Sequence, residues 1–255
     1  MVRFRIVSDL HLDLRPDAAA VADALVANDP RADCLVLAGD VAEAHWPGLR
    51  PFLERARAAY DHLVYVPGNH EYYGGVVHAT EAQLRRMPGY LNCGARDVGG
   101  VRVLGCTLWA APPPSPRLAR FGDFARIRTH DGGAGFTAGW TRRDMCAAHA
   151  LHAAWLEKQL AAGPALVVTH HAPVTGDSSP DRYRGAPDEA FFASDVGAAL
   201  GPRTLGWVFG HTHHAATLAR AGYTLWTNAL GYPGEATGHR DLVIDVPAAQ
   251  ETGRL

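Results

Sequence analysis

Five short polar clusters carry the side chains of this sequence that are best suited to chemistry. The clusters are Asp9-Leu10-His11, Gly39-Asp40, Gly68-Asn69-His70-Glu71, His170-His171 and Gly210-His211-Thr212-His213. Carboxylate oxygens, imidazole nitrogens and an amide oxygen are ligands for divalent transition-metal ions. None of the clusters contains a cysteine, which argues against a structural zinc site built on thiolates. The clusters therefore predict a metal site with Asp, Asn and His ligands.

The number of candidate ligands indicates two metal ions. The candidates are Asp9, His11, Asp40, Asn69, His170, His211 and His213. These are too many for one tetrahedral ion that must keep a coordination position open. Two ions separated by ~3.5–4 Å need a bridging carboxylate, and such a pair can clamp a phosphate and activate a water. Among the metals, Mn and Fe are favoured and Zn is the further candidate.

Each cluster directly follows a short apolar run that is typical of a β-strand. The expected strands are Phe4–Val7, Cys34–Leu37, Leu63–Val66, Val101–Leu104, Leu166–Thr169, Trp207–Phe209, Tyr223–Thr227 and Leu242–Val246. The expected helices are Ala18–Asn28, Leu49–Tyr60, Thr80–Met87 and Thr141–Leu160. Alternation of this kind predicts an α/β protein. Because ligands bind where the carboxyl ends of strands meet, we expect the five clusters to converge, although each alone has a structural explanation as a turn, a helix cap or a core histidine.

Two further histidines, His149 and His152, lie on the last expected helix, which begins with a capping box of Thr141 and Asp144. Their spacing of three residues would allow them to share a metal. However, they lie on the same helical stripe as Met145 and Leu156. A stripe of this kind favours packing against the core over metal binding.

The segment from Ala110 to Gly139 is rich in proline, glycine and arginine, and we predict a long loop there. Long loops within a domain are often functional lids. The aromatic residues of this region favour packing over disorder; they are Trp109, Phe121, Phe124, Phe136 and Trp140. We therefore expect one domain over residues 1–255 with a lid-like insertion at about 110–140.

Taken in order, the five clusters resemble the full motif set of the calcineurin-like metallophosphoesterases, over residues 9 to 213. The resemblance implies a four-layer α-β-β-α sandwich of two mixed sheets flanked by helices. The C-terminal strands after Gly210 would then extend the second sheet. The resemblance also implies that Asp9, His11 and His213 hold the first metal. The second would be held by Asn69, His170 and His211, and Asp40 would bridge the two.

In that family a metal-bridging hydroxide attacks phosphorus, and the histidine of the Gly-Asn-His motif protonates the departing oxygen. Asn69 and His70 are thus the expected catalytic residues of the third cluster. General considerations agree, because an imidazole that binds no metal can donate a proton near neutral pH.

The residues next to the clusters carry weaker expectations. Supporting or packing roles are expected for His171, His214, Asp13, Tyr72 and Tyr73. Five arginines are expected at exposed surface positions, and the alternative for each is contact with a substrate anion. They are Arg120, Arg126, Arg128, Arg182 and Arg184.

The expected substrate is a small phosphomonoester or phosphodiester. The Asp-Arg-Gly that follows the second motif in Ser/Thr protein phosphatases has no counterpart after Asp40, and the lipid-A-pathway pyrophosphatases carry Arg at the position of His70. Cyclic-nucleotide phosphodiesterases are closer, usually with Asp in place of Glu71. Two alternatives remain. One is a non-catalytic metal-binding scaffold of the same fold, and the presence of His70 argues against it. The other is a mononuclear metal hydrolase of amides or esters.

Composition excludes several other classes of protein. Hydrophobic residues make up 47% of the 255 residues and charged residues 20%, as in ordinary globular domains. The net charge of −2 gives no broad basic field for nucleic acid, and no apolar run predicts a membrane span or a signal peptide. The four cysteines have no paired spacing, so we expect a reducing, cytoplasmic location. The sequence does not indicate an oligomeric state.

Overall fold

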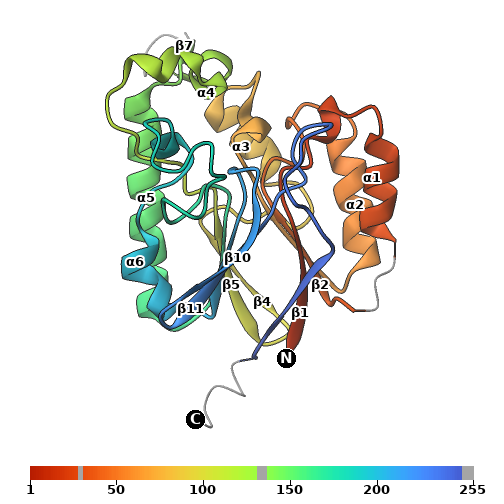
Figure 1. The fold of residues 1–255 in the computed structure, drawn as a ribbon. Helices are drawn as coiled ribbons and strands as arrows, with labels where there is room; N and C mark the ends of the chain where they lie inside the picture. The colour runs from red at the N-terminus through yellow and green to blue at the C-terminus, as the bar shows by residue number, and fades with distance from the viewer. Residues whose placement is uncertain (28–30, 131–136, 249–255) are drawn as a thin grey trace.

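Two β-sheets form the centre of the computed structural model, which describes residues 1–27, 31–130 and 137–248 (Figure 1). The first sheet has the strand order β12 (Leu242–Val246), β1 (Val2–Val7), β2 (Cys34–Ala38), β3 (His62–Val66). The second has the order β10 (Ala215–Arg220), β11 (Tyr223–Asn228), β9 (Gly206–Phe209), β8 (Leu166–Thr169), β5 (Val101–Cys106), β4 (Gly94–Val98). Both sheets are mixed, since β12 runs antiparallel to β1, and β10 and β4 run antiparallel to their neighbours.

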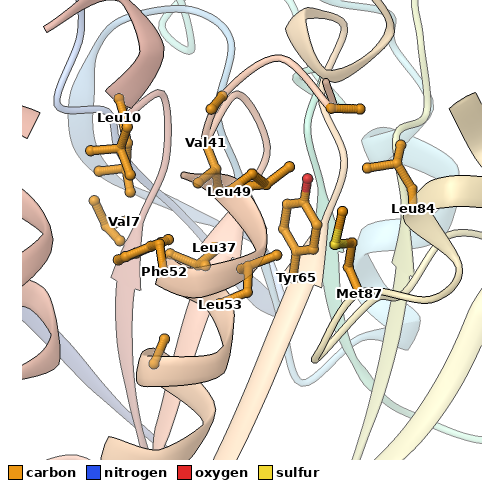
Figure 2. Close-up of a cluster of buried hydrophobic side chains, with 14 of the residues drawn as sticks. Val7, Leu10, Leu37, Val41, Leu49, Phe52, Leu53, Tyr65, Leu84 and Met87 are labelled. Atoms are coloured by element: carbon orange, nitrogen blue, oxygen red, sulfur yellow. The ribbon is translucent and has the colours of Figure 1, made fainter. Parts of the chain in front are cut away.

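The two sheets pack face to face, and helices cover their outer faces. Side chains such as Phe4 and Val36 from the first sheet meet Val168 and Val208 from the second in one buried cluster. Figure 2 shows the outer face of the first sheet, where side chains of β1, β2 and β3 pack against Phe52 and other residues of helix α2. The central strands β2 and β8 are buried on both faces, which explains why they read as continuous apolar runs. The predicted four-layer sandwich is confirmed.

Six α-helices lie among the described residues. They are α1 (Ala18–Val26), α2 (Leu49–Ala59), α3 (Val77–Leu84), α4 (Gly122–Arg126), α5 (Arg142–Ala161) and α6 (Gly197–Leu200). The capping box of Thr141 and Asp144 at the start of α5 is confirmed. Helix α3 begins three residues before the predicted start at Thr80, and the predicted end of α1 at Asn28 lies outside the described residues. None of the described helices has the length and apolar character needed to cross a bilayer.

The packing role predicted for the two histidines of α5 is confirmed. His149 Nδ1 lies 3.2 Å from the carbonyl oxygen of Leu108, and the amide of Leu108 donates a hydrogen bond to His152 Nδ1 at 3.1 Å. Both side chains therefore bind the backbone that follows β5, and no metal is needed to explain them.

The prediction for the C-terminal strands was half wrong. Strands β10 and β11 extend the second sheet, but β12 pairs with β1 in the first. The amide group of Asn228, at the end of β11, donates hydrogen bonds to the carbonyl oxygens of Ile6 and Arg240, both at 2.8 Å. These bonds direct the chain back to β1, where Ile244 becomes buried. Two edge strands, β4 and β10, were not predicted: both are partly exposed, and their small and charged residues give a weak strand signal.

The segment at 110–140 is not the continuous loop that we predicted. It contains a 3-10 helix (Pro116–Arg120), α4, and an antiparallel pair of strands, β6 (Arg128–His130) and β7 (Thr137–Gly139). Trp109 and Trp140 are buried, as the packing argument expected, and Phe121 stacks on Phe191 with ring centroids 3.8 Å apart. Tertiary contacts therefore impose short elements on a sequence without local periodicity. Phe136 lies outside the described residues.

Candidate metal centre

The five predicted clusters meet at one place, where β1, β2 and β3 of the first sheet and β8 and β9 of the second sheet end. Hydrogen bonds join the two sheets there. The backbone amide of His211 donates to Asp9 Oδ1 at 3.0 Å, and His170 Nδ1 lies 2.9 Å from the carbonyl oxygen of Ala38. The five clusters therefore converge as the sequence predicted, and they come from the strand ends of both sheets.

Three of the predicted ligands, Asp9, His11 and His213, form the first group of side chains able to hold an ion. His11 Nε2 lies 3.1 Å from His213 Nε2, and His213 Nε2 lies 3.5 Å from Asp9 Oδ1. Ser8 Oγ donates a short hydrogen bond to the second oxygen of Asp9, so that carboxylate is fixed.

A second group contains Asp40, His170 and His211. His170 Nε2 lies 3.1 Å from His211 Nδ1 and 3.3 Å from Asp40 Oδ1. Asn69 joins this group, because its Oδ1 lies 3.0 Å from His170 Nε2. This is the ligand set that the resemblance assigned to the second metal.

The carboxylate of Asp40 lies between the two groups. Its Oδ1 faces His170, while its Oδ2 lies 4.0 Å from His11 Nε2 and 3.9 Å from His70 Nε2. The backbone amide of His70 also donates to Asp40 Oδ1 at 2.9 Å. Asp40 is thus placed where a bridging carboxylate has to be. His11, Asp40 and His70 are themselves close enough to form a third possible cluster.

The backbone at the centre is held in an uncommon conformation. Five of the predicted ligands have φ between 46° and 66°, in the left-handed region: Asp9, His11, Asp40, His211 and His213. Such residues cost of order 1–3 kcal/mol each and tend to cluster at functional sites. Gly68 permits the close approach, since a Cβ there would lie 2.2 Å from Asp40 Oδ1. The motif glycines are therefore required by the packing of the ligands themselves.

The electrostatics of the centre suit divalent cations. Burial raises the pKa of Asp9, whereas Asp40 keeps a pKa well below its usual value because nearby His170 and His70 outweigh the effect of its burial. Burial also lowers the pKa of His11 and of His211, so these imidazoles are neutral and have a nitrogen lone pair for a metal. Among the described residues, the side chains that pair with the carboxylates of Asp9 and Asp40 are histidines, and a buried carboxylate requires compensation by positive charge. The donor set therefore fits two divalent ions.

His70 lies beside the predicted ligands, on a 3-10 turn (His70–Tyr72). Its ring packs against His11 and Tyr73, with centroid distances of 4.5 and 4.2 Å. Its Nε2 faces Asp40 and lies 3.1 Å from the hydroxyl of Tyr232. Burial lowers the pKa of His70. The ring is therefore oriented toward the position that Asp40 bridges.

The residues with weaker expectations are placed as follows. His171 is buried next to the rings of His211 and Trp109, and both of its ring nitrogens lack a hydrogen-bond partner. Asp13 and Tyr72 do not line the cavity, and the Tyr72 hydroxyl donates to Glu81. Tyr73 lines the cavity, whereas His214 does not.

Two of the five arginines, Arg120 and Arg182, line the cavity, and Arg182 also pairs with Glu235. The others do not line it. Arg126 lies over the Tyr73 ring and pairs with Glu43, while Arg184 pairs with Asp181. Arg128 is exposed, as expected.

Three functional candidates were missed by the sequence analysis: Asp123, Tyr232 and Glu235. Asp123 accepts a hydrogen bond from Asn69, Glu235 accepts one from His213, and Tyr232 stacks on His11 with centroids 4.4 Å apart. None belongs to a recognisable motif. For Asp123 the only signal in the sequence was its position within the predicted insertion. For Tyr232 and Glu235 it was the run Gly231-Tyr-Pro-Gly234-Glu235, which is typical of a turn.

A cavity of about 230 Å³ opens onto the centre. Asp40, Asn69, His70, His211 and His213 form its floor. Its walls combine aromatic with charged and polar side chains and come mainly from the insertion, the segment around 179–192 and the turn at 232–235. The aromatic lining residues are Tyr73, Phe121, Tyr183, Phe191, Phe192 and Tyr232. The cavity is suited to a small molecule with an anionic group at the floor and an apolar part against the walls.

Comparison with known proteins gives a family match over most of the chain. The family described as calcineurin-like phosphoesterase matches residues 2–215. A relative, an uncharacterized protein of Acanthamoeba polyphaga mimivirus, is 26% identical over 265 residues, and the alignment covers 91% of each chain.

Solved structures with a similar fold include two phosphoester-related enzymes. The phosphopantetheinyl hydrolase PptH from Mycobacterium tuberculosis superposes with a TM-score of 0.67 at 18% identity, covering 90% of this chain and 89% of that one. A dimetal phosphatase from Danio rerio superposes with a TM-score of 0.52 at 14% identity, covering 89% of this chain and 86% of that one. At these identities the likeness shows a shared fold.

Proposed function

This chain belongs to the calcineurin-like phosphoesterase family, and from that premise we propose that it hydrolyses a small phosphomonoester or phosphodiester at a centre of two divalent metal ions. The observation that carries the proposal is the position of Asp40, whose two oxygens face two separate groups of ligands. A dinuclear centre needs such a shared carboxylate, and a mononuclear hydrolase does not.

The proposed ligands follow the two groups. Asp9, His11 and His213 hold the first ion. The second ion is held by Asn69, His170 and His211, and Asp40 bridges the pair. When bound, the two ions supply positive charge to the phosphoryl oxygens and lower the pKa of a water toward neutrality. Because the donors are imidazole, carboxylate and amide groups, Mn and Fe are the favoured metals and Zn the further candidate.

His70 is the proposed general acid. A leaving alcohol needs a proton, and His70 Nε2 faces the floor of the cavity on the side of Asp40 Oδ2. The rings of Tyr73 and His11 both pack against the imidazole, and these contacts restrict its rotation before substrate binds. The Tyr232 hydroxyl lies 3.1 Å from the same nitrogen, at hydrogen-bond distance.

The cavity walls support a small organic phosphate ester as substrate. Arg120 and Arg182 offer positive charge at the opening, and the aromatic side chains offer apolar surface for the alcohol part. Two proteins with a similar fold, a phosphopantetheinyl hydrolase and a dimetal phosphatase, have activities of the same broad class. We further propose a cytoplasmic location, since all four cysteines are free.

The experiment that tests this function measures hydrolysis of p-nitrophenyl phosphate and bis-p-nitrophenyl phosphate by metal-stripped protein refilled with Mn. Wild type is compared with His70→Ala and Asp40→Asn, and rates are read against metal content. His78→Ala and Asp245→Asn, at exposed positions away from the cavity, serve as matched controls. We expect metal-dependent turnover in wild type and in both controls, and a preference for one ester that decides between monoesterase and diesterase.

For His70→Ala we expect a loss of ~10²–10⁴ in rate on esters of alkyl alcohols, and a smaller loss on nitrophenyl esters, whose leaving group needs less protonation. For Asp40→Asn we expect loss of activity together with loss of one or both ions. A wild type that binds two ions yet hydrolyses no phosphate ester would favour the alternative function, a metal-binding scaffold of the same fold. One tightly bound ion per active chain would instead favour a mononuclear hydrolase.

A further inference from the structure

Asp123 is a buried carboxylate that belongs to none of the five clusters and yet contacts the metal centre. It lies on α4, within the insertion at 110–140, and is 6% exposed. Its Oδ1 accepts hydrogen bonds from Asn69 Nδ2 and from the Tyr73 hydroxyl, both at 2.8 Å. The Tyr73 hydroxyl also lies 3.1 Å from Asn69 Nδ2. The insertion is thereby bonded to a ligand residue.

This contact decides which way the amide of Asn69 points. Asp123 Oδ1 accepts hydrogen bonds from two donors, Asn69 Nδ2 and the Tyr73 hydroxyl, so the NH₂ group of Asn69 faces Asp123. The carbonyl oxygen then faces the opposite side, where it lies 3.0 Å from His170 Nε2. An amide flipped the other way would present hydrogens to the ion in place of an oxygen. Asp123 thus selects the one orientation of Asn69 that can bind a metal.

Glu235 has the equivalent place on the other side of the centre. His213 Nδ1 donates to Glu235 Oε2 at 2.5 Å, which leaves His213 Nε2, the atom that faces His11 and Asp9, without a proton. Glu235 is itself held by Arg182, which donates to its Oε1 at 2.8 Å, and by the amide of Tyr232, which donates to its Oε2 at 3.1 Å.

We propose that Asp123 and Glu235 are positioning residues, each of which completes one half of the metal centre. Asp123 acts on the ion held by Asn69, His170 and His211. Glu235 acts on the ion held by Asp9, His11 and His213. The proposal rests on the dinuclear centre of the proposed function and extends it, because it ties the affinity of each ion to a different loop of the cavity wall.

The two effects should be separate. Loss of a hydrogen-bond partner of a metal ligand typically costs ~10–100-fold in metal affinity. Because Asp123 and Glu235 contact different ligands and share no partner, their effects on binding free energy should add.

The test titrates metal-free protein with Mn²⁺ by calorimetry and follows the bound ions by electron paramagnetic resonance. Wild type, Asp123→Asn, Glu235→Gln and the double variant are compared. Each single variant should weaken one binding step ~10–100-fold and leave the other within about threefold, and the double variant should weaken both. At low Mn²⁺ loading, each single variant should show the spectrum of a single bound ion in place of the spectrum of the coupled Mn pair. The spectra of Asp123→Asn and Glu235→Gln should differ, because the two variants retain ions at different positions.

A His213→Ala background assigns the steps. The His213→Ala protein should retain only the ion next to Asn69. Adding Asp123→Asn to it should lower the affinity for that ion, whereas adding Glu235→Gln should not. Asp188→Asn and Asp177→Asn are matched controls. Asp188 pairs with Arg117 of the insertion and Asp177 with Arg220, and neither contacts a ligand. Tyr73→Phe, which removes one of the two donors to Asp123 without removing a charge, should give a smaller loss in the same step as Asp123→Asn.

Circular dichroism and thermal unfolding of the metal-free variants check that each one folds, and Tyr73→Phe carries the test for the Asn69 side if Asp123→Asn does not fold. Unchanged affinities in folded variants, or both variants weakening the same step, would overturn the proposal while leaving the dinuclear centre of wild type in place. A wild type that binds no Mn²⁺ would overturn this proposal and the proposed function together.

Discussion

Glu71 holds the backbone of Asp40 in place: its Oε2 accepts a hydrogen bond from the Asp40 amide at 3.0 Å. The same oxygen accepts from the amide of Gly68 at 2.6 Å, and Oε1 accepts from the amide of Val41 at 2.7 Å. Glu71 is completely buried. One carboxylate therefore joins the ends of β2 and β3 beside the proposed bridging ligand, and it belongs to none of the groups of possible metal ligands among the described residues.

Replacing Glu71 by Ala should destabilise the protein strongly. Three buried backbone amides would lose their acceptor, and an unpaired buried donor costs ~1–3 kcal/mol, so we expect a total loss of roughly 3 kcal/mol or more. Denaturant unfolding of the metal-free protein measures this loss. Glu54→Ala, which removes an exposed carboxylate paired with Arg50, should change stability by no more than ~0.5 kcal/mol. Equal effects of the two substitutions would contradict the role assigned to Glu71.

Gly39→Ala should disrupt the metal centre, whereas Gly176→Ala should not. Both glycines have positive φ, +89° and +84°, so both substitutions carry a similar backbone penalty of ~1–2 kcal/mol. They differ in space: a Cβ at Gly39 would lie 2.2 Å from His170 Nδ1, whereas a Cβ at Gly176 would meet nothing within 4 Å. We expect Gly39→Ala to lose Mn²⁺ affinity in calorimetry and Gly176→Ala to keep it. Retained affinity in Gly39→Ala would show that the ring of His170 can move freely.

His152 should make stability depend on pH in the acid range. Its burial, helped by repulsion from His149, lowers its pKa to about 4. In the unfolded chain the pKa of a histidine is ~6.5. Between about pH 4 and pH 6.5 the unfolded chain therefore binds more protons than the folded protein, so the free energy of unfolding rises with pH across this window. Because the unfolded chain takes up this proton more readily, about 3 kcal/mol of stability should be lost as the pH falls from about 6.5 to 4.

The matched variant is His152→Asn, which does not titrate and can still accept the hydrogen bond from Leu108. The free energies of unfolding of wild type and variant, measured with chelator present so that metal release does not contribute, should converge or cross as the pH is lowered. A difference that is independent of pH would mean that His152 keeps an ordinary pKa in the folded protein.

Removal of metal should lower the thermal stability of wild type. Ions that bind only the folded state stabilise it by ~2.7 kcal/mol each at a concentration one hundred times the dissociation constant. Melting curves with chelator and with Mn²⁺ should therefore differ by several degrees. Asp40→Asn should gain much less from Mn²⁺ than wild type, and Asp245→Asn, at an exposed position of β12, should gain as much. Equal gains for wild type and Asp40→Asn would place the stabilising ions elsewhere.

The candidate ligands could be selected from the sequence because each one combines a residue type with a position that the local sequence reveals. Asp40, for example, follows the five apolar residues of β2. Asp123 and Glu235 could not be predicted, since the partners that give them a role, Asn69 and His213, lie 54 and 22 residues away in the chain. Strand β4 was missed for a related reason: at an edge of the second sheet its half-exposed side chains give a weak apolar signal.

The sequence by itself determined the alternation of strands and helices, the types of the candidate ligands and their order along the chain. These follow from residue chemistry and short-range periodicity, which need no knowledge of distant contacts. Only the tertiary structure decided that Asp40 lies between two groups of histidines, that β12 returns to β1, and that the insertion reaches Asn69 through Asp123. Those relationships depend on how two sheets pack against each other, and packing is settled by the sum of many weak contacts between residues far apart in the chain.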